Sequence, residues 1–486
     1  MKAVAAFLAL ALLAAVVVIL DGGDDHTGGR QRPSSTPQAR NVVVVMTDDM
    51  RFDDLAAMPF TRRMFAERGT SFISAYDDFP LCCPSRAAFL TGQYAHNHGV
   101  QGNGLDVVAR FMDREPDNLL PGWLRNEGYT TGMVGKYFNH YGEVGEGVVP
   151  PEWNYWRALT YPQGAPSYYS YVLNEDGRAR RYGTSRGNYL TSTLTRQAVR
   201  FIAEQRSREN GKFFLWVSYF APHNGKGRDP YNARHRYCTR APKPAPADLA
   251  AHLDDPLPRR GGYDEDTSDK PASIRRGALK PKERAGILRR HRCRRASLAA
   301  VDRGVRKIMR ALGPEAKDTF FVFLSDNGYL QGEHRVPVGK LKVYEESSRV
   351  PLMLRGPGVP AGHVDRTIVS NVDVARTIVD AAGADPGRSL DGRSLLEVLA
   401  GTAKPRAGVL IRSTTFEAVH TGRWVWARHG GKPTERELYD LAADPFQLDN
   451  LWNVRTGRAK PGYERKAQEL ETLRRRLRDC TGAGCS

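Results

Sequence analysis

The chain has 486 residues, 41% of them hydrophobic, which excludes a small single-core domain and favours one large domain with a smaller companion. The formal net charge of +18 is uneven, because Lys270 to Arg310 holds 15 lysines and arginines against two acids, Glu283 and Asp302. Such a segment suits an anionic polymer or membrane, or simply a solvated helical face, and no zinc-finger or RRM-type motif points to specific nucleic-acid binding.

The N-terminus has the pattern of an export segment. Met1-Lys2 precedes an apolar run from Ala3 to Leu20, after which Asp21 begins a polar stretch. Residues 1–20 are therefore predicted to be a signal peptide or, because the apolar run is near the minimum length for a membrane span, an N-terminal anchor. Residues 21–39 predict a flexible tether. We expect an exported protein, secreted or anchored at the outer face of the membrane.

Four short apolar runs predict strands that are buried on both faces of a sheet. Helical patterns lie between them, so we expect an α/β fold with a mainly parallel mixed sheet covered by helices on both faces. Ligands of such sheets bind beyond the carboxyl ends of the strands. The strands are predicted at 42–46, 129–134, 213–220 and 319–324, and the helices at 59–68, 119–127, 189–204 and 298–312.

Two later regions depart from this alternation. Residues 224–296 are rich in proline, arginine and glycine, and predict a long surface insertion. From about residue 400 the pattern changes to strands at 407–413 and 423–428 and a charged amphipathic helix at 464–478. We therefore divide the chain into a large domain over 40–399 and a smaller C-terminal α+β domain over 400–486.

Six cysteines in an exported chain suggest disulfide bonds, although spacing alone does not fix their connectivity. One bridge can close a small C-terminal loop, and another can join the ends of the insertion. These pairs are Cys480 with Cys485 and Cys238 with Cys293. Cys82 and Cys83 then remain unpaired.

Two oxygen-rich pairs, Asp48-Asp49 and Asp326-Asn327, follow the first and the last of the four predicted strands. A single pair of this kind usually caps a helix or forms a turn. Two pairs at equivalent strand ends favour a shared cation site. Oxygen ligands without histidine or cysteine suit Ca²⁺ or Mg²⁺ and argue against zinc.

The stretch from Leu81 to Gly92 predicts a helix whose first residue is Pro84. Cys82 then lies at the helix mouth, where free N–H groups and the helix dipole favour negative charge. Arg86, one turn further, can direct its guanidinium towards the same anion. The plainer alternative is a buried structural cysteine pair beside a helix start.

Cys82-x-Pro84-x-Arg86 resembles the signature of the type I sulfatases, in which the first cysteine is oxidised to formylglycine after translation. Cys83 does not fit that position, because Pro84 follows it directly. Further motifs match the family in the same order along the chain. They are Gly135-Lys136-Tyr137, Ala221-Pro222-His223, Gly339-Lys340 and the C-terminal Glu437-Leu438-Tyr439-Asp440-Leu441.

The resemblance implies an alkaline-phosphatase-like fold, one Ca²⁺ or Mg²⁺ per chain, and maturation by a formylglycine-generating enzyme. It implies that the metal ligands are Asp48, Asp49, Asp326, Asn327 and the modified Cys82. It also implies that sulfate, or the leaving oxygen, is contacted by four catalytic residues besides Cys82: Arg86, Lys136, His223 and Lys340.

One position departs from the family pattern. The family motif continues with a histidine after Gly-Lys-Tyr, and here that place holds Phe138. His140, two residues later, is a candidate substitute, although an exposed loop histidine is the simpler interpretation. The form Lys136-Tyr137-x-Asn139 resembles the N-acetylglucosamine-6-sulfatase branch, as does the segment from Tyr94 to His98.

We therefore interpret the chain as an exported sulfatase that hydrolyses sulfate monoesters, with N-acetylglucosamine-6-sulfate units of sulfated sugars as the expected substrate. The first alternative is an arylsulfatase, or a phosphodiesterase or phosphonate monoester hydrolase of the same superfamily. The second is a non-catalytic envelope protein that binds polyanions through Lys270 to Arg310.

Overall fold

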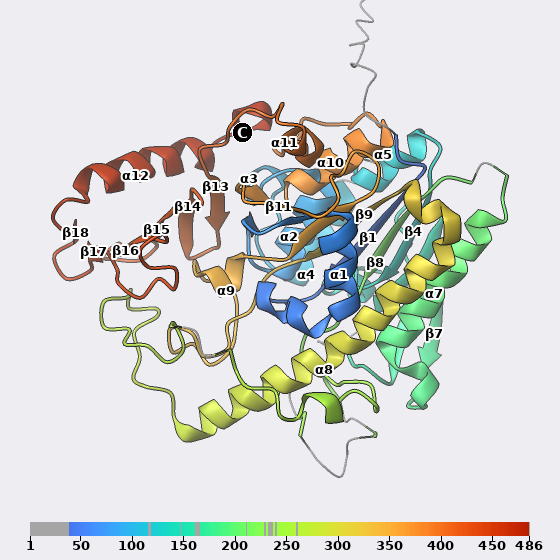
Figure 1. Ribbon diagram of the computed structural model, residues 1–486, viewed down its shortest axis with the longest axis horizontal. Helices are drawn as coiled ribbons and strands as arrows, with labels where there is room; N and C mark the ends of the chain where they lie inside the picture. Colours follow the sequence, from blue (N-terminus) through green and yellow to red (C-terminus); the bar gives the residue numbers. More distant parts are fainter. Residues whose placement is uncertain are drawn as a thin grey trace, which may run out of the picture. The chain divides into compact units, whose positions relative to one another are not determined.

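A ten-stranded mixed sheet lies at the centre of the described structure (Figure 1). The computed structural model describes residues 38–485, except 115–117, 146, 161–165, 210, 228–229, 232–236, 239–240 and 259–260. In spatial order the strands are β11 (His363–Asp365), β2 (Thr70–Phe72), β10 (Leu352–Arg355), β9 (Thr319–Ser325), β1 (Asn41–Thr47), β8 (Phe213–Ser218), β4 (Thr130–Gly135), β5 (Tyr155–Thr160), β6 (Tyr171–Glu175) and β7 (Arg178–Tyr182). The consecutive strands β9, β1, β8, β4 and β5 are parallel, whereas β10 and the β6–β7 hairpin are antiparallel to their neighbours.

The four predicted apolar strands are β1, β4, β8 and β9, which are neighbours in the sheet. Every residue of β1, β8 and β9 is buried, as continuous apolar runs predict. Thr47 pairs with Ser325, while Met46 and Gly135 each pair with Ser218. The carboxyl ends of the four strands are therefore level, and the polar residues that follow them share one edge of the sheet.

Helices cover both faces of this sheet, because alternate side chains of its strands point to opposite sides. Val42 and Val44 belong to a core with one set of helices, and Val43 and Val45 to a core with the other. The first set is α2 (Cys82–Thr91), α4 (Leu105–Arg114), α5 (Leu120–Asn126), α10 (Asp373–Ala382) and α11 (Leu395–Leu399). The second set is α1 (Pro59–Arg68), α7 (Leu190–Arg206) and α8 (Pro281–Leu312). Short helices are α3 (Ala95–His98), α6 (Tyr141–Val144) and α9 (Glu345–Ser348).

The helix α8 is much longer than predicted. It begins at Pro281 rather than at 298, so the last part of the predicted insertion 224–296 is helical. Pro281 is suited to a first helical turn, and Glu283 accepts a hydrogen bond from the backbone N–H of Lys280 at 2.8 Å. The first half of the helix is rich in arginine and has few buried apolar residues, so the sequence shows no hydrophobic periodicity there.

The helix at the cysteine motif also begins earlier than predicted. Cys82, not Pro84, is the first residue of α2, and Pro84 is the third. Proline is tolerated there because the first-turn N–H groups have no partner within the helix. Gly92 ends the helix as predicted, with a positive φ of 66°.

A four-stranded antiparallel sheet forms the C-terminal part of the chain. Its strands are β13 (Val409–Arg412), β14 (Phe416–His420), β15 (Trp424–His429) and β16 (Arg436–Asp440). It packs against α12 (Glu464–Arg478), and its Leu410 and Trp426 share a core with Ala88 of α2. Small two-stranded pairings complete the fold: β3 (Ala75–Tyr76) with β12 (Val369–Ser370), and β17 (Trp452–Asn453) with β18 (Arg458–Ala459). The predicted domain boundary near residue 400 remains a prediction.

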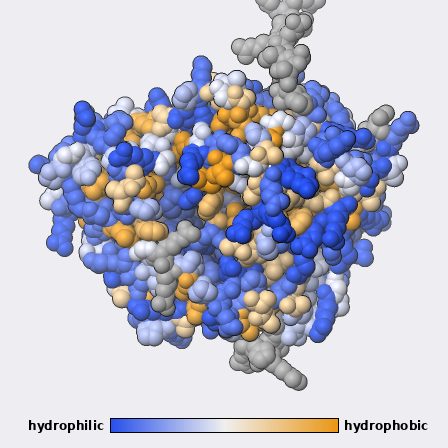
Figure 2. Space-filling view, viewed as in Figure 1, coloured by the Kyte–Doolittle hydropathy of each residue, from blue (hydrophilic) through white to orange (hydrophobic). Residues whose placement is uncertain are grey.

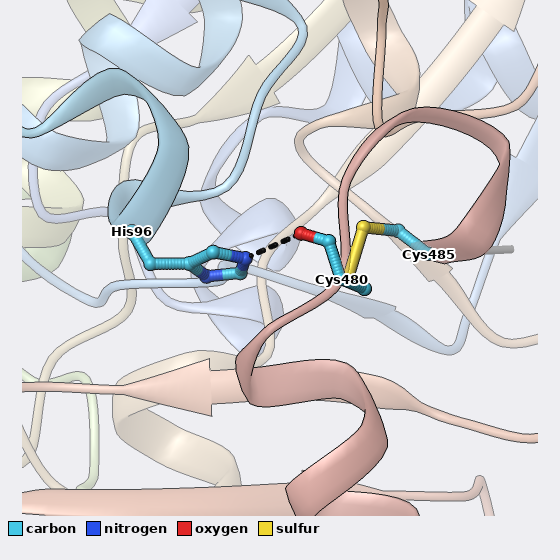
Figure 3. A group of neighbouring side chains, drawn as sticks. All are labelled: His96, Cys480 and Cys485. Carbon is cyan, nitrogen blue, oxygen red and sulfur yellow. Dashed lines mark hydrogen bonds between the residues drawn. A yellow bond between two sulfur atoms is a disulfide. The ribbon is translucent and has the colours of Figure 1, made fainter.

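Both suggested disulfide bonds are present, Cys238–Cys293 and Cys480–Cys485, and Cys82 and Cys83 are free and buried. Figure 3 shows the second bridge beside His96, whose Nε2 lies 2.9 Å from the backbone oxygen of Cys480. The two sulfur atoms are bonded to each other, so Cys480 and Cys485 form a covalent cross-link, and their group with His96 is not a metal site.

The predicted signal peptide or anchor over 1–20 lies outside the described residues, as does nearly all of the predicted tether over 21–39. Within the part of the chain that the structure describes, no helix combines the length and the apolar character needed to cross a bilayer.

Candidate active site

Cys82 lies at the point where α2 begins, between two of the predicted site residues. Its Sγ is 2.9 Å from Nζ of Lys340 and 3.6 Å from Oδ1 of Asp48. Burial raises the pKa of the Cys82 thiol to about 11, despite the opposing effect of Lys136 and Lys340. An unmodified Cys82 is therefore a neutral thiol at physiological pH and a poor nucleophile.

The two oxygen-rich pairs, Asp48-Asp49 and Asp326-Asn327, meet as expected at the ends of β1 and β9. The backbone N–H of Asp49 donates to Oδ1 of Asp326 at 3.0 Å, and Nδ2 of Asn327 donates to Oδ1 of Asp49 at 2.8 Å. Asp49 has a positive φ of 66°, a conformation that acidic and amide side chains tolerate better than most. This turn brings the consecutive carboxylates of Asp48 and Asp49 into the same site.

Two lysines neutralise these carboxylates. Nζ of Lys136, directly after β4, lies 2.5 Å from Oδ2 of Asp48. Lys340 forms an ion pair with Asp49 and lies 3.2 Å from Oδ1 of Asn327. Burial opposes ionisation of Asp49, but Lys340 and His223 outweigh it and hold the pKa of that carboxyl below its usual value.

Arg86 joins the ends of three strands from its position in α2. Its Nε and Nη2 donate to Oδ2 of Asp326 at 3.0 and 2.8 Å. Its Nη1 donates to the backbone oxygen of Lys136 at 2.6 Å and to Oγ of Ser218 at 2.7 Å. The guanidinium, expected to face a bound anion, therefore also fixes β4, β8 and β9 around the helix mouth.

His223 is the most exposed of the predicted catalytic side chains, at 21%. Its Nε2 lies 3.7 Å from Oδ2 of Asp49, while Nδ1 lies 2.8 Å from the backbone oxygen of Asn224. Since a carbonyl oxygen only accepts, Nδ1 carries a proton in this arrangement, and Nε2 is the nitrogen that faces the carboxylate.

The donor set suits a hard divalent cation. Ligand atoms of Asp48, Asp49, Cys82 and His223 all lie within 4.8 Å of one another. Asp326 is fully buried beside them, and burial together with the Asp48 carboxylate raises the pKa of Asp326. Crowded carboxylates of this kind are stabilised by a positive ion, and oxygen donors favour Ca²⁺ or Mg²⁺.

Neither Phe138, which occupies the place of the family histidine, nor the candidate substitute His140 lies among these residues. Phe138 is fully buried, with its ring 5.2 Å from that of Phe111 and 4.7 Å from that of Tyr137. His140 is about one-third exposed and its Nδ1 lies 3.0 Å from Oε1 of Glu143. Phe138 thus belongs to the hydrophobic core, and His140 to a surface loop.

Arg294 of α8 contacts the site and was not found from the sequence. It is fully buried, and Nη2 donates to the backbone oxygen of Asp49 and, at 2.7 Å, to Oδ2 of Asp54. It therefore stabilises the positive-φ turn at Asp49 through the backbone oxygen of that residue. Arg294 lies within the predicted surface insertion 224–296, so the sequence did not indicate this contact. The only sequence signal for a helix there is the capping pattern around Pro281.

A family model described as sulfatase matches residues 40–384, and one described as N-sulphoglucosamine sulphohydrolase, C-terminal, matches residues 332–475. Human N-acetylglucosamine-6-sulfatase is 33% identical over 466 aligned residues, which cover 85% of this chain and 80% of the human protein. The fold resembles that of a protein solved in complex with its substrate D-glucosamine-2-N,6-O-disulfate, with a TM-score of 0.68, 24% identity and coverage of 90% of this chain and 97% of the other. It also resembles phosphonate monoester hydrolase from Silicibacter pomeroyi, with a TM-score of 0.64, 21% identity and coverage of 90% and 93%.

Proposed function

Because this chain belongs to the sulfatase family, with its alkaline-phosphatase-like fold, and is a sulfuric ester hydrolase, we propose that it removes 6-O-sulfate from glucosamine-type units of sulfated sugars. The substrate proposal is supported by the human N-acetylglucosamine-6-sulfatase, to which most of the chain aligns. The proposed catalytic residues are Cys82 as formylglycine, Arg86, Lys136, His223 and Lys340.

Formylglycine at position 82 would supply, as its hydrate, one hydroxyl that attacks sulfur and a second whose deprotonation expels sulfate. The Sγ of Cys82 stands in for one of those oxygens, since each is a substituent of the same Cβ. Lys340, at 2.9 Å from Sγ, is therefore placed to contact the attacking group. Asp48, at 3.6 Å from Sγ, is placed to accept its proton.

The proposed metal ligands are Asp48, Asp49, Asp326, Asn327 and the modified Cys82, with Ca²⁺ or Mg²⁺ as the ion. When bound, such a cation supplies positive charge that neutralises the sulfate oxygens. The buried carboxylates and the amide, which converge from β1 and β9, support this assignment.

Sulfate esters resist hydrolysis because their oxygens repel nucleophiles and the alkoxide leaves poorly. Lys136, Lys340 and Arg86 surround the helix mouth and provide fixed positive charge, which stabilises the transition state without reorganisation. His223 is the exposed member of the group, and its Nδ1–H is bound to a carbonyl oxygen. Its imidazolium form would carry the second proton at Nε2, which is the best-placed atom to protonate the leaving oxygen and would leave the neutral Nδ1–H imidazole.

The same proposal includes export and maturation by a formylglycine-generating enzyme. It also includes a catalytic domain over 40–399 and a smaller domain over 400–486. They are supported by the apolar N-terminal run, by the Cys82-x-Pro84-x-Arg86 motif, and by the separate antiparallel sheet of the C-terminal residues.

The observation that carries the proposal is that Asp48, Lys340 and Cys82, from three distant segments, meet at the mouth of α2. Its test compares kcat/KM of the formylglycine-containing, metal-loaded protein on matched aryl sulfate, phosphate monoester and phosphonate monoester substrates, and on N-acetylglucosamine-6-sulfate. We expect the sulfates to be preferred and the sugar sulfate to be desulfated. A preference for the phosphonate would favour the phosphonate hydrolase alternative.

A further inference from the structure

A surface hollow of about 330 Å³ lies between α1 and α8. It is lined by Phe60 and Arg63 of α1 and by Arg306, Met309 and Arg310 of α8. The two helices lie side by side in Figure 1, and Figure 2 shows strongly hydrophilic residues gathered over this part of the molecule. The oxygens of Asp302 in α8 accept hydrogen bonds from the N–H groups of Phe60 and Thr61, which fixes α1 against α8 and shapes the hollow.

The charge around this hollow is not compensated. Within the described part of the chain, no ion pair involves the three arginines that line it, Arg63, Arg306 and Arg310. The same holds for their neighbours in the sequence, Arg62 and Lys307. The one acid of α8 nearby, Asp302, is occupied by the N-terminus of α1. These side chains are therefore available to an external anion.

The rest of the basic segment Lys270 to Arg310 behaves differently. About half of its basic residues, spread along the segment, are neutralised within the fold by neighbouring carboxylates, so the sequence overstates its capacity for polyanions. The ion pairs are Lys270 with Glu265 and Asp269, Arg275 with Glu435, Arg276 with Glu283, Arg284 with Asp264, Arg294 with Asp54, Arg295 with Asp255, and Arg303 with Asp248. In the described structure, Arg306, Lys307 and Arg310 at the C-terminal end of α8 are not among these pairs, and α1 adds two arginines beside them.

The hollow combines this charge with an apolar surface. The guanidinium of Arg306 lies over the ring of Phe60, 4.8 Å from its centroid, and Met309 adjoins it. Stacking on the ring holds the guanidinium plane in place, so less side-chain freedom is lost when it binds an oxyanion. Arginine binds such groups through two parallel N–H donors. An anion attached to a ring with an apolar face, such as a sulfated sugar, fits this combination.

The hollow is separate from the catalytic centre but rigidly linked to it. Arg294 of the same helix contacts the backbone oxygen of Asp49. Arg306 follows it in α8, about 18 Å further along the axis at 1.5 Å per residue. This distance is longer than a single sugar and shorter than an extended polymer.

We propose that the α1–α8 hollow is a second binding site for a sulfated polysaccharide, which holds the polymer while one of its sulfates is hydrolysed at Cys82. The identity of the ligand rests on the proposed function. Binding at the hollow raises the local concentration of chain ends or sulfated units at the catalytic centre, so it acts on polymers and not on small esters.

The test compares the double variant Arg63→Glu/Arg310→Glu with the control Arg178→Glu/Arg181→Glu, which changes two exposed arginines of β7 and shifts the net charge equally. Affinity for a heparin hexasaccharide is measured by calorimetry at about 150 mM salt, where long-range charge effects are screened. We expect binding to weaken about tenfold in the hollow variant, as two lost arginine–sulfate contacts imply, and to change little in the control. In parallel, KM for a sulfated polymer rises in the hollow variant while kcat/KM for an aryl sulfate stays at the parent value.

Equal hexasaccharide affinities of the hollow variant and the parent would overturn the proposal. An equal loss of affinity in the hollow variant and the control variant would also overturn it, because the loss would then reflect net charge and not a specific site. Preferential binding of anionic phospholipid vesicles or of duplex DNA at the hollow would also overturn it. If the parent protein releases no sulfate from any ester, the proposed function fails instead. The hexasaccharide affinities would still show independently whether the hollow binds a sulfated polysaccharide.

Discussion

Nζ of Lys340 lies 2.9 Å from Sγ of Cys82, although the two residues are 258 positions apart in the chain. The same ammonium group pairs with Asp49 and approaches Asn327, so one lysine connects the helix mouth with the end of β1 and the end of β9. Burial opposes its charge, but Asp49 and its neighbours raise the pKa of Lys340 well above the usual value. It is therefore a permanent positive charge beside the group that we propose to attack sulfur.

Replacing this charge tests its role. We expect Lys340→Met to lower kcat/KM on an aryl sulfate by about 10²- to 10³-fold, the usual loss when one preorganised electrostatic contact to the transition state is removed. Lys342 is a partly buried lysine on the same segment that forms no ion pair in the described structure, so Lys342→Met is the control and should keep parental activity. Equal activities of the two variants would exclude Lys340 from the site.

Arg86 should be needed for stability as well as for turnover. Lysine has one ammonium group in place of the fork that spans Asp326, the Lys136 carbonyl and Ser218, so Arg86→Lys leaves buried acceptors unpaired. We expect the free energy of unfolding to fall by about 3 kcal/mol, measured by urea denaturation. Arg62 is exposed and forms no ion pair with the residues that the structure describes, so Arg62→Lys should cost less than about 0.5 kcal/mol. An unchanged denaturation midpoint for Arg86→Lys would contradict the role assigned to its fork.

Restoring the family residue at position 138 should not restore a catalytic group. Phe138 is enclosed by Phe111 and Tyr137, so Phe138→His buries a polar ring without a partner and is expected to cost about 2 kcal/mol of stability without raising kcat. Phe138→Leu removes aromatic packing alone and serves as the control. A rise in kcat in the histidine variant would show that its side chain reaches the substrate, contrary to this geometry.

The polar residues at the strand ends were predictable because the runs that precede them are continuously apolar, which is a strong local signal for β1, β8 and β9. The pairs Cys480 with Cys485 and Cys238 with Cys293 were suggested by the expected export and by their places in the chain, and the structure contains both, although the sequence alone does not fix connectivity. The support of Asp49 by Arg294 was not predictable, because it depends on a tertiary contact and on a helix whose first half has almost no hydrophobic periodicity. The burial of Phe138 depends on the packing of α4 against the strand end, which a motif does not encode.

Stability should depend on pH through Glu471, which links α12 to β15. Burial opposes its ionisation, but hydrogen bonds from Arg474, Trp426 and Arg475 outweigh burial and lower the pKa of Glu471 from 4.5 to about 2. Since the folded pKa is the lower one, the ionised form stabilises the fold above pH 4.5 and this contribution is lost as the pH falls from 4.5 towards 2.

Glu471→Gln should therefore destabilise the protein by about 1 kcal/mol at pH 7, a value reduced for partial exposure, with the difference narrowing steadily towards pH 3. Thermal unfolding across this pH range measures it. Glu469→Gln on the same helix, whose pair with Lys466 is exposed, should show a small change at every pH. A pH-independent difference for Glu471→Gln would refute the linkage.

Removal of divalent cations should abolish sulfate release and lower the melting temperature, because an ion bound only by the folded state stabilises it. Ca²⁺ or Mg²⁺ should restore both properties, whereas Zn²⁺ should not, since the proposed ligands from the protein's unmodified side chains are the oxygens of Asp48, Asp49, Asp326 and Asn327. Full turnover by protein that elemental analysis shows to be free of metal would rule out the cation site.

Peptide mass spectrometry of the segment that contains Cys82, taken from protein made in its native host, tests the central claim most directly. The account predicts that Cys82 has lost its thiol and carries an aldehyde that reacts with a hydrazide probe, while Cys83, bound through its Sγ to the N–H of Asn139, keeps its thiol. An intact thiol at Cys82 in that protein would contradict catalysis by a modified residue and would favour a protein that binds sulfated polymers without hydrolysing them.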